Sequence, residues 1–237
     1  MNTSRPTLGI LGGMGTQATA SFFEKLHDLQ EVQCEQDYID VLLYSKPSIP
    51  DRTAFITGKS KDSPLDSLIS AAKTLETAGV SYIAIPCATA HFFYKELSDA
   101  VNVPIINMID ETASYIASCG YKNVYLLATD ASLKNNVFHV SFEKQGINII
   151  NNNHPANNPP STINPQHNLM SLIYDIKCGV ATEQETHEIL SNIQAQALSS
   201  GADAVVLGCT ELCVGAKETP NVINTLEILA KAVIRII

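Results

Sequence analysis

Short apolar runs alternate with longer amphipathic stretches along most of this chain. Short runs rich in Leu, Ile and Val are typical of buried strands in a parallel sheet. In the first half, the predicted strands lie at 7–12, 38–45, 80–86 and 103–108. Apolar residues at helical spacing predict helices at 16–31, 64–78, 88–101 and 109–120. Strands that alternate with helices favour an α/β fold with mostly parallel sheets.

After Gly120 the same order of elements begins again. The predicted strands of this second half lie within 123–132, 147–150, 203–208 and 219–237. Its helices are predicted at 133–145, 168–178, 183–200 and the end of the chain. The Asn- and Pro-rich stretch 151–168 is expected to be irregular, and it is either a lid over a site or a mobile connection.

Two matching segments, AGVSYIAIPCATAH (78–91) and SGADAVVLGCTEL (200–212), indicate an internal repeat. Unrelated strand–helix units also resemble one another by chance, but an ordered match of several segments favours duplication. We therefore expect two pseudo-symmetric, three-layer α/β lobes, each with a mostly parallel sheet flanked by helices, and an active site in the cleft between them. The first lobe is expected to comprise 1–108 plus 220–237, and the second to comprise 109–219.

Cys87 and Cys209 occupy corresponding places in the two segments, directly after a strand and before a helix. Ligands of open α/β sheets bind outside the carboxyl ends of the strands. The free N–H groups and the positive dipole at a helix start also favour a thiolate. Two equivalent thiols therefore predict one active site shared between the two halves.

Composition and charge narrow the classes of partner. The net charge of −9 and the pI near 5.0 argue against nucleic acid or an anionic membrane surface. The apolar part of the N-terminal segment is too short and too rich in glycine for a signal sequence or a membrane span. Six cysteines without CxxC pairs favour reduced thiols, and hence a cytoplasmic location.

The segment GMGTQA (13–18) matches the dinucleotide-binding pattern G-x-G-x-x-A, between a predicted strand and a predicted helix. That pattern also requires an acidic residue at the end of the second strand, where this chain has Tyr44, Ser45 and Lys46. The glycines are therefore expected to form a tight turn that presents backbone N–H groups to a small anion.

Other polar residues allow two interpretations each. His91 could orient the Cys87 thiol or donate to an oxyanion, or it could pack within its own helix. Arg52, in a predicted polar loop, is either solvated or a fork for a carboxylate. The acidic residues Asp110, Glu111 and Glu211 are explained by the stabilisation of helix N-termini.

The remaining cysteines give no metal-binding pattern. Cys209 and Cys213 are four residues apart, but no paired His or Cys elsewhere has ligand spacing, which argues against zinc. Buried or incidental thiols are expected at Cys34, Cys119, Cys178 and Cys213.

The chain resembles the cofactor-independent aspartate/glutamate racemase family in six segments that follow the family's order: LGILGGMGTQAT (8–19), IPDRTAFI (49–56), IPCATAH (85–91), NMIDETA (107–113), LLATDAS (126–132) and LGCTEL (207–212). The resemblance implies racemisation without pyridoxal phosphate or metal, by two cysteines on opposite faces of the substrate α-carbon. One thiolate removes the α-proton, and the other thiol protonates the planar carbanion from the far side. The family also implies a homodimer.

By this resemblance, Cys87 and Cys209 are the catalytic pair. Arg52 binds the side-chain carboxylate of an acidic amino acid, with Lys177 beside it. Contacts to the α-carboxylate or the α-ammonium are implied for Gly13, Met14, Thr89, Thr129 and Thr210. The position of Ala88 usually carries an asparagine that helps to bind the α-carboxylate, and the loss of such a hydrogen bond costs roughly 1.5–3 kcal/mol.

The function implied is an amino-acid racemase, an isomerase that interconverts the L and D forms of aspartate or glutamate. One alternative is a related isomerase of the maleate isomerase or hydantoin racemase type. Another is a carboxylate-binding protein in which Ala88 has weakened catalysis. In each case the partner is a small amino acid or dicarboxylate.

Overall fold

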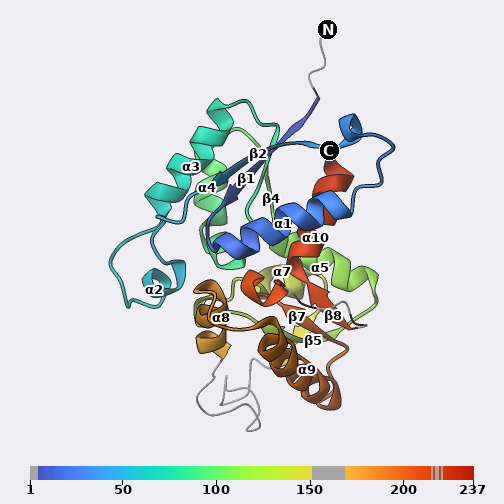
Figure 1. Cartoon of the computed structure of the whole chain (residues 1–237). Coiled ribbons are helices and arrows are strands. Elements are labelled where there is room, and N and C mark those ends of the chain that lie inside the picture. Colours follow the sequence, from blue (N-terminus) through green and yellow to red (C-terminus); the bar gives the residue numbers. More distant parts are fainter. Residues whose placement is uncertain (1–4, 151–168, 215, 217–218, 220) are drawn as a thin grey trace.

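Two parallel sheets form the framework of the protein (Figure 1). The structure is a computed structural model, and it describes residues 5–150, 169–214, 216, 219 and 221–237. The four-stranded sheets have the orders β2-β1-β3-β4 and β6-β5-β7-β8. The first contains β1 (Thr7–Gly12), β2 (Asp40–Ser45), β3 (Tyr82–Ala84) and β4 (Ile105–Ile106). The second contains β5 (Asn123–Leu127), β6 (Asn148–Ile149), β7 (Ala204–Leu207) and β8 (Val222–Asn224). The same strand order in both sheets confirms the predicted pair of pseudo-symmetric α/β halves.

Helices cover both faces of the sheets. Those of the first half are α1 (Thr16–Asp28), α2 (Arg52–Ile56), α3 (Leu65–Thr77), α4 (Tyr94–Ala100) and α5 (Met108–Ser118). Those of the second half are α6 (Asp130–Lys134), α7 (His139–Lys144), α8 (Leu169–Lys177), α9 (Glu183–Ser199) and α10 (Thr225–Ile236). Short 3-10 helices are η1 (Glu35–Asp37), η2 (Ala88–Phe93) and η4 (Thr210–Cys213).

Strand β1 is apolar on both faces because it is covered on both sides. Leu8 and Ile10 join a core that includes Phe22 of α1, whereas Leu11 joins a separate core that includes Leu68 of α3. All five side chains are fully buried. This two-sided burial explains the continuous apolar run at the start of the chain, since a strand with one wet face would alternate.

The last helices of the two halves, α5 and α10, start in the same way and pack against each other. Asn107 accepts hydrogen bonds from the first N–H groups of α5, and Asn224 does the same for α10, so both helices start in the same way. Helix α10 packs against α1 and α5, while α5 also packs against α7. Strand β8, however, pairs with β7 of the second sheet. The first lobe was expected to include all of 220–237, but the strand in this stretch belongs to the second sheet.

Two local details differ from the sequence-based expectations. The predicted helix at 88–101 begins as the 3-10 helix η2 and continues as α4, and the predicted helix at 133–145 is divided into α6 and α7. The break lies near Asn136, whose φ of 54° is a left-handed conformation that asparagine tolerates. The stretch 151–168, with its two interpretations, lies outside the described residues. Within the described part of the chain, no helix is both long and apolar enough to cross a membrane.

Candidate active site

Both cysteines line one small cavity between the two halves. The first half contributes Met14, Arg52, Thr53, Cys87, Ala88 and Thr89. The second half contributes Thr129, Lys177, Cys209, Thr210 and Glu211. All the predicted site residues except Gly13 therefore meet at this cavity, together with Thr53 and Glu211, to which the sequence had assigned no site role.

The two cysteines reach the cavity from equivalent elements. Cys87 follows β3 and is the N-cap residue of η2, and Cys209 follows β7 and is the N-cap residue of η4. Gly208 allows the second turn to pack closely, because a Cβ atom there would lie only 2.6 Å from Leu126 Cδ1. Both thiols are buried, with 5% and 3% exposure. The repeat in the sequence thus becomes a pair of thiols facing a shared space.

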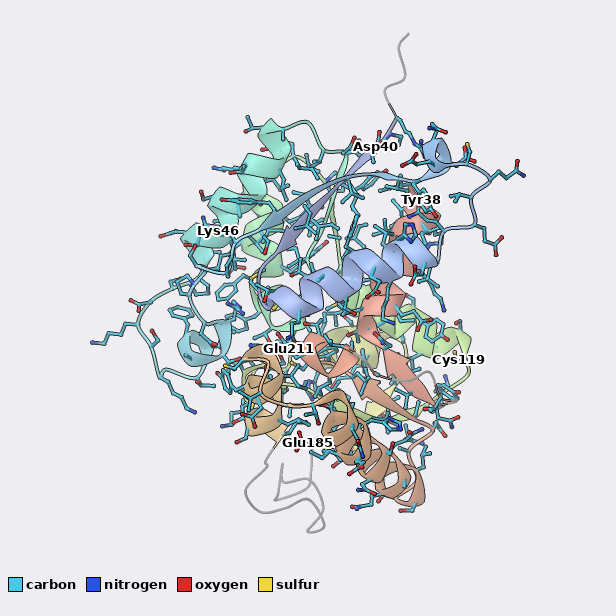
Figure 2. All side chains as sticks on the ribbon, viewed as in Figure 1. Tyr38, Asp40, Lys46, Cys119, Glu185 and Glu211 are labelled. Carbon is cyan, nitrogen blue, oxygen red and sulfur yellow. The ribbon has the colours of Figure 1, made fainter. Side chains whose placement is uncertain are left out.

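Glu211 is buried next to Cys209, and its carboxylate accepts hydrogen bonds from residues of both halves. Its Oε2 accepts hydrogen bonds from Cys209 Sγ at 3.0 Å and from Thr210 Oγ1 at 3.4 Å. Its Oε1 accepts one from the backbone N–H of Gly15 at 3.0 Å. Figure 2 shows Glu211 in the region between the two halves. Glu211 does lie in the first turn of η4, as expected, but its carboxylate also bonds to a site thiol and lines the cavity.

This carboxylate also changes the expectation for the Cys209 thiol. Burial, and then the negative charge of Glu211, raise the pKa of Cys209 well above its usual value. The helix that starts at Cys209 is the four-residue η4, too short for a strong dipole. The pKa of Cys209 is therefore shifted in the direction opposite to the one expected from its place at a helix start.

Lys177 is the last residue of α8 and supplies a partly buried positive charge. Its ammonium lies 3.9 Å from Glu211 Oε1 and 5.3 Å from the ring centroid of Tyr174. Burial on its own lowers the pKa of Lys177, but the negative charge of Glu211, followed by the contributions of Cys209 and Cys87 when they are thiolates, outweighs it, so the pKa is raised. The raised pKa favours a charged ammonium at the cavity.

Arg52 lies at the start of α2 and not in a loop, and its guanidinium is buried. The Asp51 side chain caps this helix by accepting from the Ala54 N–H at 2.7 Å. The guanidinium donates to the carbonyl oxygens of Ile49 at 3.2 Å, Pro50 at 3.0 Å and Met14 at 3.3 Å. Its Nε has no partner, and no ion pair is found for Arg52 among the described residues. A buried cation without a carboxylate favours the fork interpretation over solvation.

Three buried hydroxyl groups join the halves, and two of them, those of Thr89 and Thr129, belong to residues that line the cavity. Thr89 Oγ1 lies 3.0 Å from Thr129 Oγ1, which lies 3.0 Å from Ser132 Oγ. Ser132 Oγ is also 3.3 Å from Thr89 Oγ1, so the three form a closed, buried triangle. Such hydroxyls can turn their protons toward or away from a ligand, since each is both donor and acceptor.

His91 is buried and connects the backbone of Cys87 to the start of α5. Its Nε2 accepts a hydrogen bond from the Met108 N–H at 3.1 Å, so Nδ1 carries the proton and donates to the Cys87 carbonyl at 3.0 Å. Burial lowers the pKa of His91, which keeps the ring neutral. These contacts are to backbone atoms, which favours the packing interpretation of His91.

The contacts of Gly13 and Cys213 are with residues that do not line the cavity. The N–H of Gly13 donates to Thr19 Oγ1 at 2.9 Å and is not offered to the cavity. Its φ is +91°, and a Cβ there would lie 2.5 Å from the Lys46 nitrogen, so the turn requires glycine. Buried Cys213 lies 3.6 Å from Thr225 Oγ1.

Among the residues that the structure describes, no group of three or more His, Cys, Asp or Glu is placed to hold a metal ion.

A cleft between two duplicated α/β halves, with one strand-end cysteine from each, defines the class of this protein. Residues 11–233 match the Asp/Glu/Hydantoin racemase family. The chain belongs to this family.

Two amino-acid racemases and an aspartate racemase homologue resemble this chain over most of its length. The broad specificity amino-acid racemase RacX of Bacillus subtilis (strain 168) is 28% identical over 215 residues, covering 86% of this chain and 85% of that protein. The structure of Picrophilus torridus aspartate racemase has a TM-score of 0.79 at 30% identity and covers 98% of this chain and 94% of its own. An aspartate racemase homologue from Pyrococcus horikoshii OT3 has a TM-score of 0.71 at 25% identity, covering 97% of this chain and 98% of its own.

Proposed function

We propose that this protein is an amino-acid racemase that interconverts the L and D forms of an acidic amino acid, aspartate or glutamate. The observation that carries the proposal is the pair of cysteines, Cys87 and Cys209, which come from equivalent strand ends and line one cavity. Inversion at a carbon by proton transfer needs two acid/base groups on opposite faces, and a duplicated scaffold supplies them. The racemase relatives support this proposal.

In the proposed reaction, one cysteine acts as a thiolate and removes the α-proton. The other acts as a thiol and protonates the planar carbanion from the opposite face. The roles exchange when the other enantiomer is bound. Negative charge that develops on the α-carboxylate is stabilised by preorganised donors, for which Thr89, Thr129 and Thr210 are the candidates. This chemistry is proposed to need neither pyridoxal phosphate nor a metal ion.

The preference for an acidic substrate rests on two cations that line the cavity, the buried Arg52 and the partly buried Lys177. Arg52 lines the cavity and has a buried Nε without a partner, and the raised pKa of Lys177 favours a charged ammonium there. A carboxylate side chain would satisfy both, and charge-assisted hydrogen bonds of this kind contribute about 1.5–3 kcal/mol each. Because the protein as a whole carries a net charge of −9, such local cations are needed to attract an acidic substrate.

Proton exchange in deuterated water tests the proposal directly. The purified protein is incubated with single L-amino acids, including aspartate and glutamate, and the product is analysed by NMR and chiral chromatography. We expect α-deuterated amino acid and the D enantiomer from at least one acidic substrate. The absence of both from the whole panel would overturn the proposal.

Two further candidates are separated by the same panel. Maleate and hydantoins test an isomerase of the maleate isomerase or hydantoin racemase type. A carboxylate-binding protein with weakened catalysis is suggested by Ala88, which presents only a methyl group to the cavity. Thermal stabilisation by dicarboxylates without α-proton exchange would favour that candidate. We also propose that the protein is cytoplasmic and that it forms a homodimer. Sedimentation velocity tests the homodimer.

A further inference from the structure

The strands at the edges of the two described sheets differ in length. Strands β4 and β6 have two residues each and β8 has three, whereas β2 has six. Proteins commonly prevent an edge strand from pairing further by making it very short, or by placing a bulge, a proline or a lysine in it. Strand β2 pairs with β1 in one continuous register, and Asp40–Ser45 contains neither proline nor lysine. Among these edges, β2 is therefore the one open to another strand.

The backbone of β2 presents hydrogen-bonding groups on the side away from β1. The Lys46 N–H, directly after the strand, donates to the Gly12 carbonyl oxygen at 3.1 Å. Because the N–H and C=O groups of successive residues alternate between the two sides of a strand, the even-numbered residues of β2 face β1. Val41, Leu43 and Ser45 therefore face outward, as the row of groups that makes an edge strand a template for pairing.

The side chains of β2 leave apolar surface exposed on both faces of this edge. Leu42 is 39% exposed and Leu43 is 38% exposed. Val41 packs against the core on one face of the sheet, and Tyr44 packs against the core on the other. Since side chains alternate along a strand, Leu43 lies on the face of Val41 and Leu42 on the face of Tyr44. A strand paired with β2 would cover both leucines.

The two ends of β2 carry opposite charges. Asp40 begins the strand and Lys46 follows its last residue, and Figure 2 shows these two residues at opposite ends of β2. In an antiparallel pair of β2 strands with a two-fold axis at Leu43, Asp40 of each copy lies opposite Lys46 of the other. Opposite charges directly across two strands are stabilising, and like charges are destabilising. The charges of β2 are therefore complementary to a second copy of the same strand.

We propose that two copies of this protein associate through β2, in an antiparallel pair of strands centred on Leu43. The pairing joins the first sheets of the two copies into one continuous sheet. The outward backbone groups of Leu43 bond to those of Leu43 in the second copy, and those of Val41 bond to Ser45. On the other face, Leu42 lies opposite Tyr44, and aromatic–aliphatic pairs of this kind stabilise neighbouring strands.

The charges also select this register over its neighbours. A shift by two residues keeps outward groups paired, but it places Asp40 opposite Tyr44 in one direction and opposite Ser48 in the other. The second shift also brings Pro47, which has no N–H, opposite Val41. The pairing centred on Leu43 forms both charge pairs and keeps the proline outside the paired strands.

The size of this surface predicts a dimer that dissociates on dilution. A pair of short strands buries less than the roughly 800 Å² per partner of a standard interface. Each copy also carries a net charge of −9, so the copies repel one another at long range and local complementarity has to hold them. The inference names the surface of the proposed homodimer, and no step in it depends on racemase activity. Its failure is therefore distinguishable from failure of the proposed reaction.

Sedimentation velocity over a range of protein concentrations tests the surface. Leu43→Lys exposes two apolar contacts and places two ammonium groups at the two-fold axis, so we expect the dimer Kd to rise at least about 100-fold. Val140→Lys is the matched control, because Val140 is an apolar residue on α7 that is 57% exposed in the other half of the molecule. It should leave the dimer Kd unchanged.

A charge exchange tests the register. Asp40→Lys and Lys46→Asp each give copies with like charges at both ends of β2, so each variant alone should dimerise about tenfold more weakly. An equimolar mixture restores both opposite-charge pairs in a dimer of one copy of each variant. Native mass spectrometry identifies this mixed dimer by its mass, and we expect it to exceed both dimers of a single variant. The same result shows that the variants are folded.

Amide hydrogen exchange of the wild-type protein, followed by NMR, needs no substitution. The N–H groups of Val41, Leu43 and Ser45 should exchange more slowly as the concentration rises, whereas that of Leu42, which faces β1, should not change. Three results would overturn the inference: a dimer unaffected by Leu43→Lys, a mixture no better than the single variants, or a monomeric wild type at every concentration. The last would leave β2 as an edge for a strand of another protein.

Discussion

Thr89 of the first half and Thr129 of the second are joined by a hydrogen bond of 3.0 Å between their Oγ1 atoms. Both side chains are buried and line the cavity that holds the two cysteines. The bond therefore ties the halves together at the place where the substrate is proposed to bind. The stability of the molecule and the shape of the site depend on the same pair of hydroxyls.

Removing the Thr129 hydroxyl should destabilise the protein. Its Oγ1 also caps α6 by accepting from the Ser132 N–H at 3.2 Å, so Thr129→Val loses a cap and leaves buried hydroxyls with fewer partners. We expect a loss of about 2 kcal/mol in the free energy of unfolding by urea. Thr129→Ser keeps the hydroxyl and should lose only about 0.8 kcal/mol for the buried methyl group. Equal stability of the valine variant and the wild type would contradict this role.

Replacing Arg52 by lysine should weaken binding of the acidic substrate. A lysine cannot reach the Met14, Ile49 and Pro50 carbonyl oxygens together, nor offer a planar fork. We expect KM for the acidic amino acid to rise about 10- to 100-fold, which corresponds to roughly 1.5–3 kcal/mol. The matched control is Arg235→Lys, whose guanidinium pairs with Glu111 on α5. If both variants keep the wild-type KM, Arg52 does not bind the substrate carboxylate.

The stability of the protein should decrease in mild acid because of His91. Burial holds the pKa of His91 below its usual value of 6.5, so in this range the unfolded chain binds a proton that the folded protein does not. The contribution of His91 to stability is complete above pH 6.5 and declines as the pH falls from there toward the lowered pKa. The unfolding free energy at pH 7.5 and pH 5.0 should therefore differ less in His91→Gln than in the wild type. An equal difference would show that His91 does not contribute to the pH dependence.

Adding a carboxamide at residue 88 should improve an acidic-amino-acid racemase. Ala88 lines the cavity next to Cys87 and presents no polar atom from its side chain. If the substrate α-carboxylate lies there, Ala88→Asn adds a hydrogen bond and should raise kcat/KM about tenfold. Ala88→Ser, with a shorter polar group, serves as comparison. A fall in kcat/KM for the asparagine variant would indicate that the cavity needs this space for the substrate.

The sequence predicted the structural features that depend on the local pattern of apolar residues or on the internal repeat. Strands β1 and β7 follow from apolar runs, and the meeting of Cys87 with Cys209 follows from equivalent strand ends in a duplicated α/β fold. Glu211 was missed because an acid at a helix start already has a local explanation. Its contacts with Gly15 and Lys177 join residues that are distant in the sequence. The clue was present in the repeat, where a glutamate in one half replaces a threonine in the other.

Other differences come from tertiary packing that local pattern does not contain. Helix α2 has only five residues, too few for a periodic signal, so Arg52 was expected in a loop. The Gly13 N–H was expected to face a ligand, but Thr19 on the next helix accepts it. Strand β8 was assigned to the first lobe with α10, but pairing with β7 places it in the second sheet.

The central claim is that Cys87 and Cys209 act on the same α-carbon from opposite faces. The most direct measurement is the α-proton exchange of Cys87→Ala and Cys209→Ala in deuterated water, with each enantiomer of the amino acid that the wild-type enzyme racemises. We predict that both variants lose racemisation by at least about 100-fold and that each retains exchange with one enantiomer, opposite for the two variants. Exchange with the same enantiomer by both variants, or undiminished racemisation by either, would contradict the claim.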